Sequence, residues 1–258
     1  MRQPSGTDLR RTQVGASGQR AIRKFRAQDT GQPVITGAMV GGVPSAAALI
    51  DLLGALAYGQ LAAFDHLAAD ARIASTLAGR ARMSTMAAEE LVHHRLLVAR
   101  LHELGVEPAA AMSPFIGPVE QYHRLTTPSD WPEAVVKAYV GESIAADFYR
   151  EMTAMVDAPT RELIEQVLTV SDRAEFAVAE LASELAVDDS RRGRLALWSR
   201  RLVGEAISQV QHCLAQRDAL MDMLIGQSAG GALASVSALI SRIVAQHETR
   251  MTRLHLAP

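Results

Sequence analysis

Apolar residues recur every three or four positions along almost the whole chain from residue 44 onward, which is the spacing of amphipathic helices. The spacing predicts long helices over about 45–74, 77–104, 129–156, 159–185, 192–225 and 232–254, with a short one around 119–125. Gly105 is a typical helix end, and in "SDWPE" Ser129 or Asp130 can cap a helix while Glu133 reaches back. Long helices joined by short turns favour antiparallel pairs. We therefore predict an all-α fold, in which a bundle over about 45–185 is followed by two additional long C-terminal helices over 192–255.

The composition supports this prediction. Hydrophobic residues make up 48% of the chain and aromatic residues only 4%, so Ala, Leu, Val and Met must build the core. A net charge of −2 argues against a general polyanion binder. Cys213 is the single cysteine, which excludes a disulfide framework and fits a reducing cytoplasm. The uncharged stretches 30–50 and 223–241 are interrupted by glycines and polar residues, so we expect no membrane span.

Residues 1–42 differ from the rest, since seven basic residues stand against two acidic ones with little apolar periodicity. We interpret this segment as a disordered basic arm ahead of one domain over 43–258. The ordinary interpretation is a solvated tail, and the sharper alternative is an arm that attracts RNA.

A carboxylate and an imidazole interrupt the apolar face of the second predicted helix. One continuous stripe, in steps of three and four, holds Met86, Glu90, His93, Leu97, Leu101 and Leu104. A buried carboxylate needs a partner or must lose its charge, and Glu-x-x-His offers two metal ligands on one helix face. A lone Glu-x-x-His is more often a surface ion pair, so its position within the stripe is what favours the metal.

Further polar residues are expected to face the same interior. Gln60 and Glu142 lie among apolar neighbours on the first and third helices, so we predict a cluster of Gln60, Glu90, His93 and Glu142 at mid-bundle. Glu205, on the fifth helix, is expected to pair with a buried arginine, with a ligand role as the alternative. Tyr139 and Tyr149 are first of all core residues, and could also surround the site.

Three stretches carry a family likeness: "AYGQLAAFDHLAADARIA", "TPSDWPEAVVKAYVGESIAADFYREM" and "LALWSRRLVGEAISQVQ". Together with the inward acids they make about residues 45–226 resemble the actinobacterial tRNA-hydroxylase-like (MiaE-like) proteins of the ferritin-like superfamily. The resemblance implies an antiparallel four-helix bundle and a non-haem di-iron centre that activates dioxygen, with tRNA as the substrate of the best-understood relatives. Carboxylates and imidazoles suit iron in that chemistry.

Carried onto this chain, the ligand set implied by the resemblance is incomplete. Glu90, His93 and Glu142 match, Gln60 replaces an acid by an amide, and the second acid-x-x-His is missing. One register places Val170 and Arg173 there, and another places Asp172 and Glu175. In the first register a guanidinium would repel a second iron. We therefore predict that Arg173 replaces a metal and pairs with Glu142 or Glu90, so that the site holds one iron weakly or none.

The resemblance and these residues together leave three functions open, and the incomplete ligand set makes activity as a hydroxylase doubtful. The first is a di-iron hydroxylase acting on tRNA or another apolar group, with one or two iron ions. The second is a non-catalytic ferritin-like bundle that acts as a binding or structural partner. Iron storage is the third, and the two extra helices argue against it. The electron donor and the formation of a homo-oligomer stay open at this point.

Overall fold

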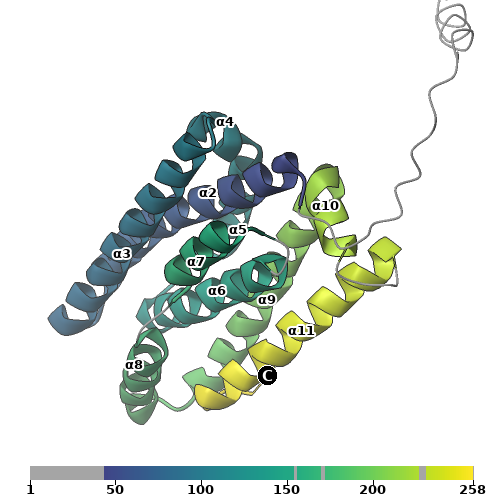
Figure 1. Ribbon diagram of the computed structural model, residues 1–258. Helices are drawn as coiled ribbons and strands as arrows, with labels where there is room; N and C mark the ends of the chain where they lie inside the picture. Colours follow the sequence, from purple (N-terminus) through teal and green to yellow (C-terminus); the bar gives the residue numbers. More distant parts are fainter. Residues whose placement is uncertain (1–43, 154–155, 170–171, 227–230, 258) are drawn as a thin grey trace, which may run out of the picture. The chain divides into compact units, whose positions relative to one another are not determined.

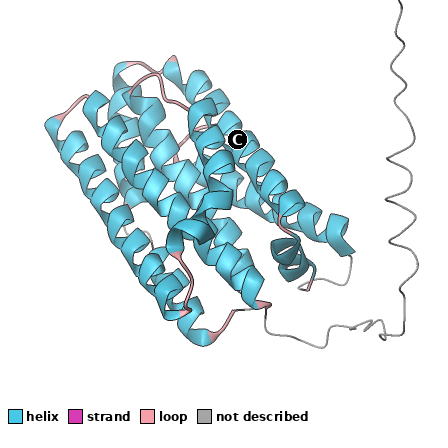
Figure 2. Ribbon diagram, turned by 90° about the horizontal axis from the view of Figure 1, so that it is seen from above, coloured by secondary structure: helices cyan, strands magenta, loops and turns pink. Residues whose placement is uncertain are grey.

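The computed structural model describes residues 44–153, 156–169, 172–226 and 231–257. Every regular element in these ranges is a helix, which confirms the predicted all-α class (Figure 2). The predicted basic arm over residues 1–42 lies outside the described residues. The helices lie in one compact unit, residues 41–258.

The first two long helices pair along their length as a hairpin. Helix α2 (Ala46–Asp70) continues into the 3-10 turn η1 (Ala71–Ile73), and α3 (Leu77–Glu103) returns beside it (Figure 1). The hydroxyls of Ser45 and Thr76 cap their first turns by accepting hydrogen bonds from backbone N–H groups. Gly105, at φ +72°, follows the end of α3, as predicted.

The connection to the third long helix is itself largely helical. It contains α4 (Pro108–Met112), η2 (Ser113–Phe115) and α5 (Ile116–Leu125), so the helix predicted at 119–125 is longer than expected. Helix α5 packs against both α2 and α9 (Arg191–Gln216), and so covers the bundle with one face while the other stays exposed.

Helix α6 (Trp131–Met152) begins at a reciprocal cap that the sequence predicted. The Asp130 carboxylate accepts a hydrogen bond from the backbone N–H of Glu133 at 3.1 Å, and the Glu133 carboxylate accepts one from Ser129 N–H at 2.8 Å. Helix α6 then packs against α2, α8, α9 and α11, which places it at the centre of the fold.

The prediction of one continuous helix over 159–185 is wrong. The structure has α7 (Ala158–Val167) and α8 (Arg173–Val187), and Asp172 before α8 takes a left-handed backbone conformation at φ 53°. Short polar side chains such as aspartate tolerate this conformation, whereas it cannot continue a right-handed helix.

The helix predicted over 192–225 is also divided. Helix α9 ends at Gln216, and α10 (Asp218–Ile225) starts after Arg217, whose backbone leaves helical geometry at ψ 85°. The Arg217 guanidinium forms an ion pair with the buried Asp51 carboxylate, with Nε to Oδ2 at 3.0 Å, and so ties the start of α10 to α2. Helix α11 (Gly231–Arg253) closes the fold against α6, α9 and α10.

The α2–η1 segment, 46–73, is the one helix among the described residues that is long and apolar enough to cross a membrane, with mean hydropathy 1.6. Its most apolar window is 56% buried inside the protein, where Leu52, Leu53 and Leu56 join the core. A core helix of a bundle has the same length and composition, and the packing of α2 against α3 assigns it that role.

Candidate functional site

A cluster of buried charges lies between α3, α6 and α8. The Arg173 side chain, 3% exposed at the first residue of α8, forms ion pairs with Glu90 on α3 and with Glu142 on α6. Its Nη2 lies 2.5 Å from Glu90 Oε1, and the Glu90 side chain is fully buried. The half-exposed Glu89 stands farther from the same nitrogen, at 3.5 Å. The guanidinium therefore bridges the two inward carboxylates.

The imidazole of His93 turns toward α2 from the edge of this cluster. Its Nδ1 lies 3.2 Å from Gln60 Oε1 and 3.6 Å from Glu90 Oε2. An amide oxygen can only accept a hydrogen bond, so this arrangement assigns the proton to Nδ1 of His93. The structure thus brings together Gln60, Glu90, His93 and Glu142, with Arg173 among them. His94 faces the neighbouring helix instead, where its Nδ1 lies 2.8 Å from the Ala57 carbonyl oxygen.

The structure distinguishes between the two alternative registers for the second acid-x-x-His motif. Asp172 is exposed and pairs with Arg82, and Glu175 is exposed and pairs with Arg253, so neither faces the interior. The register that places Arg173 inward therefore describes the fold, and the Asp172–Glu175 register is wrong. Val170, the other residue of the first register, lies outside the described residues.

The three residues expected around the site differ in their surroundings. Tyr139 and Tyr149 are buried in the hydrophobic core. Glu205 on α9 is only partly buried and has no ion pair within the described ranges, so the predicted buried pair with an arginine is wrong. Burial is the main cause that raises the pKa of Tyr122, and the Glu205 carboxylate raises it further.

A di-iron centre does not fit the residues at this position. An arginine guanidinium keeps its charge at all ordinary pH values, and here it already forms ion pairs with the two carboxylates that iron would need. A metal ion beside it would face a fixed positive charge in a poorly screened interior. His93 Nδ1 is engaged by Gln60, and the described residues hold no group of three or more His, Cys, Asp or Glu suited to a metal.

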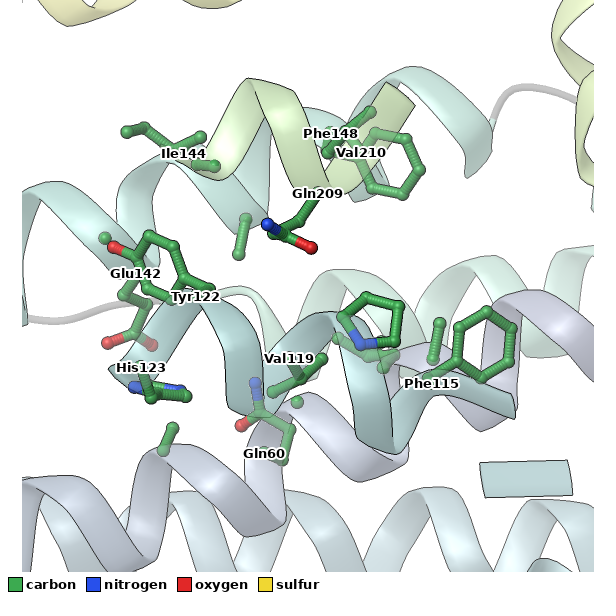
Figure 3. A pocket seen from close by; sticks show the side chains of 18 of the residues that line it. Gln60, Phe115, Val119, Tyr122, His123, Glu142, Ile144, Phe148, Gln209 and Val210 are labelled. Atoms are coloured by element: carbon green, nitrogen blue, oxygen red, sulfur yellow. The ribbon is translucent and has the colours of Figure 1, made fainter. Parts of the chain in front are cut away.

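An apolar cavity of about 220 Å³ adjoins this cluster. Gln60 and Glu142 belong to its wall, so the cavity begins where the ion pairs end. Helices α2, α5, α6 and α9 supply most of the lining, which is predominantly apolar. Figure 3 shows Glu142, Tyr122 and His123 toward one side of the cavity and the rings of Phe115 and Phe148 toward the other.

The polar part of the cavity wall contains a buried amine. Burial lowers the pKa of Lys137 on α6 to about 8, and the Asp70 carboxylate on α2 partly opposes this shift. Burial raises the pKa of Asp70 in turn. The imidazoles of His66 and His123 stack with ring centroids 3.8 Å apart, and burial, aided by Lys137, lowers the pKa of both, to about 2 for His123. At neutral pH the two imidazoles are therefore uncharged and Lys137 is predominantly a cation.

Sequence reasoning missed this second group of residues. Lys137 is one of only two lysines in the chain, and it stands within the apolar face of its helix, which is the signal that could have marked it. His66 and His123 lack metal-ligand spacing, and only the packing of α5 on α2 brings them together.

The described residues form an all-helical bundle of long packed helices, which is the class of fold that ferritin-like proteins have. A family model described as a ferritin-like domain of actinomycetes matches residues 45–227. The chain belongs to this family. None of the curated proteins matches the chain.

Proposed function

We propose that this protein is a ferritin-like bundle that works without a metal centre and binds an apolar small molecule in the cavity beside the former metal position. The observation that carries the proposal is the Arg173 guanidinium between Glu90 and Glu142, next to a cavity of about 220 Å³. The guanidinium forms ion pairs with both carboxylates, as a metal ion in this position would, and it is covalently part of the chain.

The charge arrangement supports a structural role for the former centre. A buried ion pair with both partners held in place on different helices fixes the relative positions of those helices. Here one guanidinium joins α8 to both α3 and α6. The centre thus stabilises the wall of the cavity and needs no metal to do so.

The cavity has the composition of a small-molecule site. Such sites are mostly apolar, with a few polar groups that fix the orientation of the ligand. Its lining combines core residues such as Leu56, Phe115 and Phe148 with the polar groups of Lys137 and His123. An apolar molecule that enters leaves water and gains dispersion contacts with these walls.

Heptan-1-ol is a suitable probe of this proposal. We expect saturable binding in isothermal titration calorimetry and a rise in the unfolding temperature, because a ligand of the folded state stabilises it by mass action. Gly59 lines the cavity, and a Cβ built there meets only Tyr149 Oη, at 3.8 Å, so Gly59→Leu has room to fill the space. This variant should stay folded and lose the binding.

Gly204→Leu is the matched control. Gly204 is also a helical glycine, a Cβ there meets nothing within 4 Å, and it does not line the cavity. It should bind the alcohol as the wild type does. Absence of binding by the wild type, or equal binding by Gly59→Leu, would overturn the proposal.

A further inference from the structure

Three polar groups in the cavity wall have no partner among the described residues. The Lys137 side chain lies on the buried face of α6, its residue is 5% exposed, and its amine has neither a hydrogen bond nor an ion pair there. Tyr122 Oη and His123 Nδ1 are also buried without a hydrogen-bond partner within the described ranges. Buried polar atoms are almost always satisfied, so the two orphaned atoms of Tyr122 and His123, together with the unpaired Lys137 amine in the same wall, call for a ligand.

These groups belong to one region of the cavity. Lys137 acts electrostatically on His66, His123 and Asp70, so all four side chains are near neighbours. Tyr122 Oη stands close to Gly141, one helical turn after Lys137, since a Cβ built on Gly141 would lie 2.8 Å from it. Ala55 and Asp70 both line the cavity and are separated by about 22 Å along α2. Lys137 lies near Asp70. Phe115 lies toward the Ala55 end, since the Arg217 guanidinium stands 5.9 Å from its ring centroid and pairs with Asp51, one turn before Ala55.

All three orphaned groups can donate a hydrogen bond. An ammonium and a phenol are donors, and a neutral imidazole donates from one of its nitrogens. Glu142 forms an ion pair with Arg173, whereas Lys137 is a cation of the cavity wall with no ion-pair partner within the described ranges. Asp70 beside Lys137 and Glu205 near Tyr122 oppose an anion, so the hydrogen bonds must outweigh their repulsion. A group with several acceptor oxygens and one negative charge fits these donors.

We infer that the cavity binds a monocarboxylic acid with an unbranched apolar tail, whose carboxylate accepts hydrogen bonds from Lys137, Tyr122 and His123 while the tail extends toward Phe115. The inference rests on the proposed function, and adds the chemical class of the ligand. A cavity of about 150 Å³ accommodates benzene, so a cavity of about 220 Å³ holds roughly nine non-hydrogen atoms. Heptanoate has this size, and its narrow tail suits a cavity drawn out along α2.

Paired titrations with heptanoate and heptan-1-ol at pH 7 test the inference. The wild type should bind heptanoate at least about tenfold more tightly than the alcohol, because hydrogen bonds to charged groups are the stronger ones. Lys137→Met should weaken heptanoate binding by about tenfold or more and weaken heptan-1-ol binding much less, because the alcohol has no charge for the ammonium to pair with. Binding of the alcohol also establishes that the variant is folded.

Asp70→Asn is the matched control, since it removes the neighbouring negative charge and keeps the amine. It should bind heptanoate as tightly as the wild type, or more tightly. If the alcohol binds but heptanoate binds no better, or if Lys137→Met leaves the preference unchanged, the carboxylate inference is overturned and the proposed function stands. If neither compound binds the wild type, both are overturned.

Discussion

Substitution of Arg173 by methionine removes the cation that holds Glu90 and Glu142 while keeping a long side chain in the space. The loss of the cation should cost most at Glu90, because its side chain is fully buried and Arg173 is the cation closest to it. Removing one partner of a buried ion pair costs about 3–5 kcal/mol. For a chain of this size a loss of 3 kcal/mol corresponds to a fall in melting temperature of about 6–12 °C. We expect a loss in this range at pH 7.

Urea unfolding followed by circular dichroism measures this cost as a lower midpoint with an unchanged slope. Arg82→Met is the matched control: Arg82 also joins α3 to the start of α8, through the exposed Asp172, and an exposed pair contributes at most about 1 kcal/mol. Combining Arg173→Met with Glu90→Gln should recover more than half of the loss, because the fully buried one of the two carboxylates left unpaired no longer carries a charge. A loss for Arg173→Met no larger than that for Arg82→Met would refute the reasoning.

Three further predictions concern the rest of the fold. Burial, and then Arg250, lowers the pKa of the buried His247 to about 4, whereas an imidazole in the unfolded chain has a pKa near 6.5. The unfolded chain therefore takes up the proton first, and the free energy of unfolding of the wild type should fall by about 2 kcal/mol through this residue between pH 7 and pH 5. In urea titrations at the two pH values His247→Leu should lose correspondingly less, and an equal loss would contradict the prediction. Gly54→Ala should lower the melting temperature, because its Cβ would collide with the backbone carbonyl of Ala111, whereas Gly204→Ala should raise it by helix propensity; the reverse order would contradict the packing of α4 on α2. Asp51→Asn should speed amide hydrogen exchange in α10 more than in α3, since the Arg217 pair ties α10 to α2, and a uniform change would speak against that role.

Most helices could be predicted from the sequence because capping residues and glycines close to their ends determine where they begin and end. Gly105 ends α3 and the Asp130–Glu133 cap begins α6, and both were readable without the structure. The break before α8 was not, because apolar residues keep helical spacing on both sides of it. It depends on the backbone of one residue, Asp172, and periodicity does not report a single left-handed conformation.

The candidate site divides in the same way. Spacing along one helix placed Glu90 and His93 on a common face, and an inward position for Arg173 followed from one of two registers. Which register holds depends on how α8 docks on α3, and only the fold decides that. Lys137 was missed because a lysine on an apolar helix face ordinarily extends its amine to solvent. Its neighbours Asp70 and His123 come from α2 and α5, at separations in sequence that no local pattern connects.

The central claim is that the Arg173 guanidinium stands where a metal would otherwise bind. Iron content per chain, measured by mass spectrometry on protein purified after iron supplementation, tests it most directly, with a Gln60→Glu/Arg173→His variant that restores an acid and an imidazole as the comparison. The account predicts no bound iron in the wild type and measurable iron in the variant. Two irons per wild-type chain, with the absorption band of a bridged di-iron centre, would contradict it.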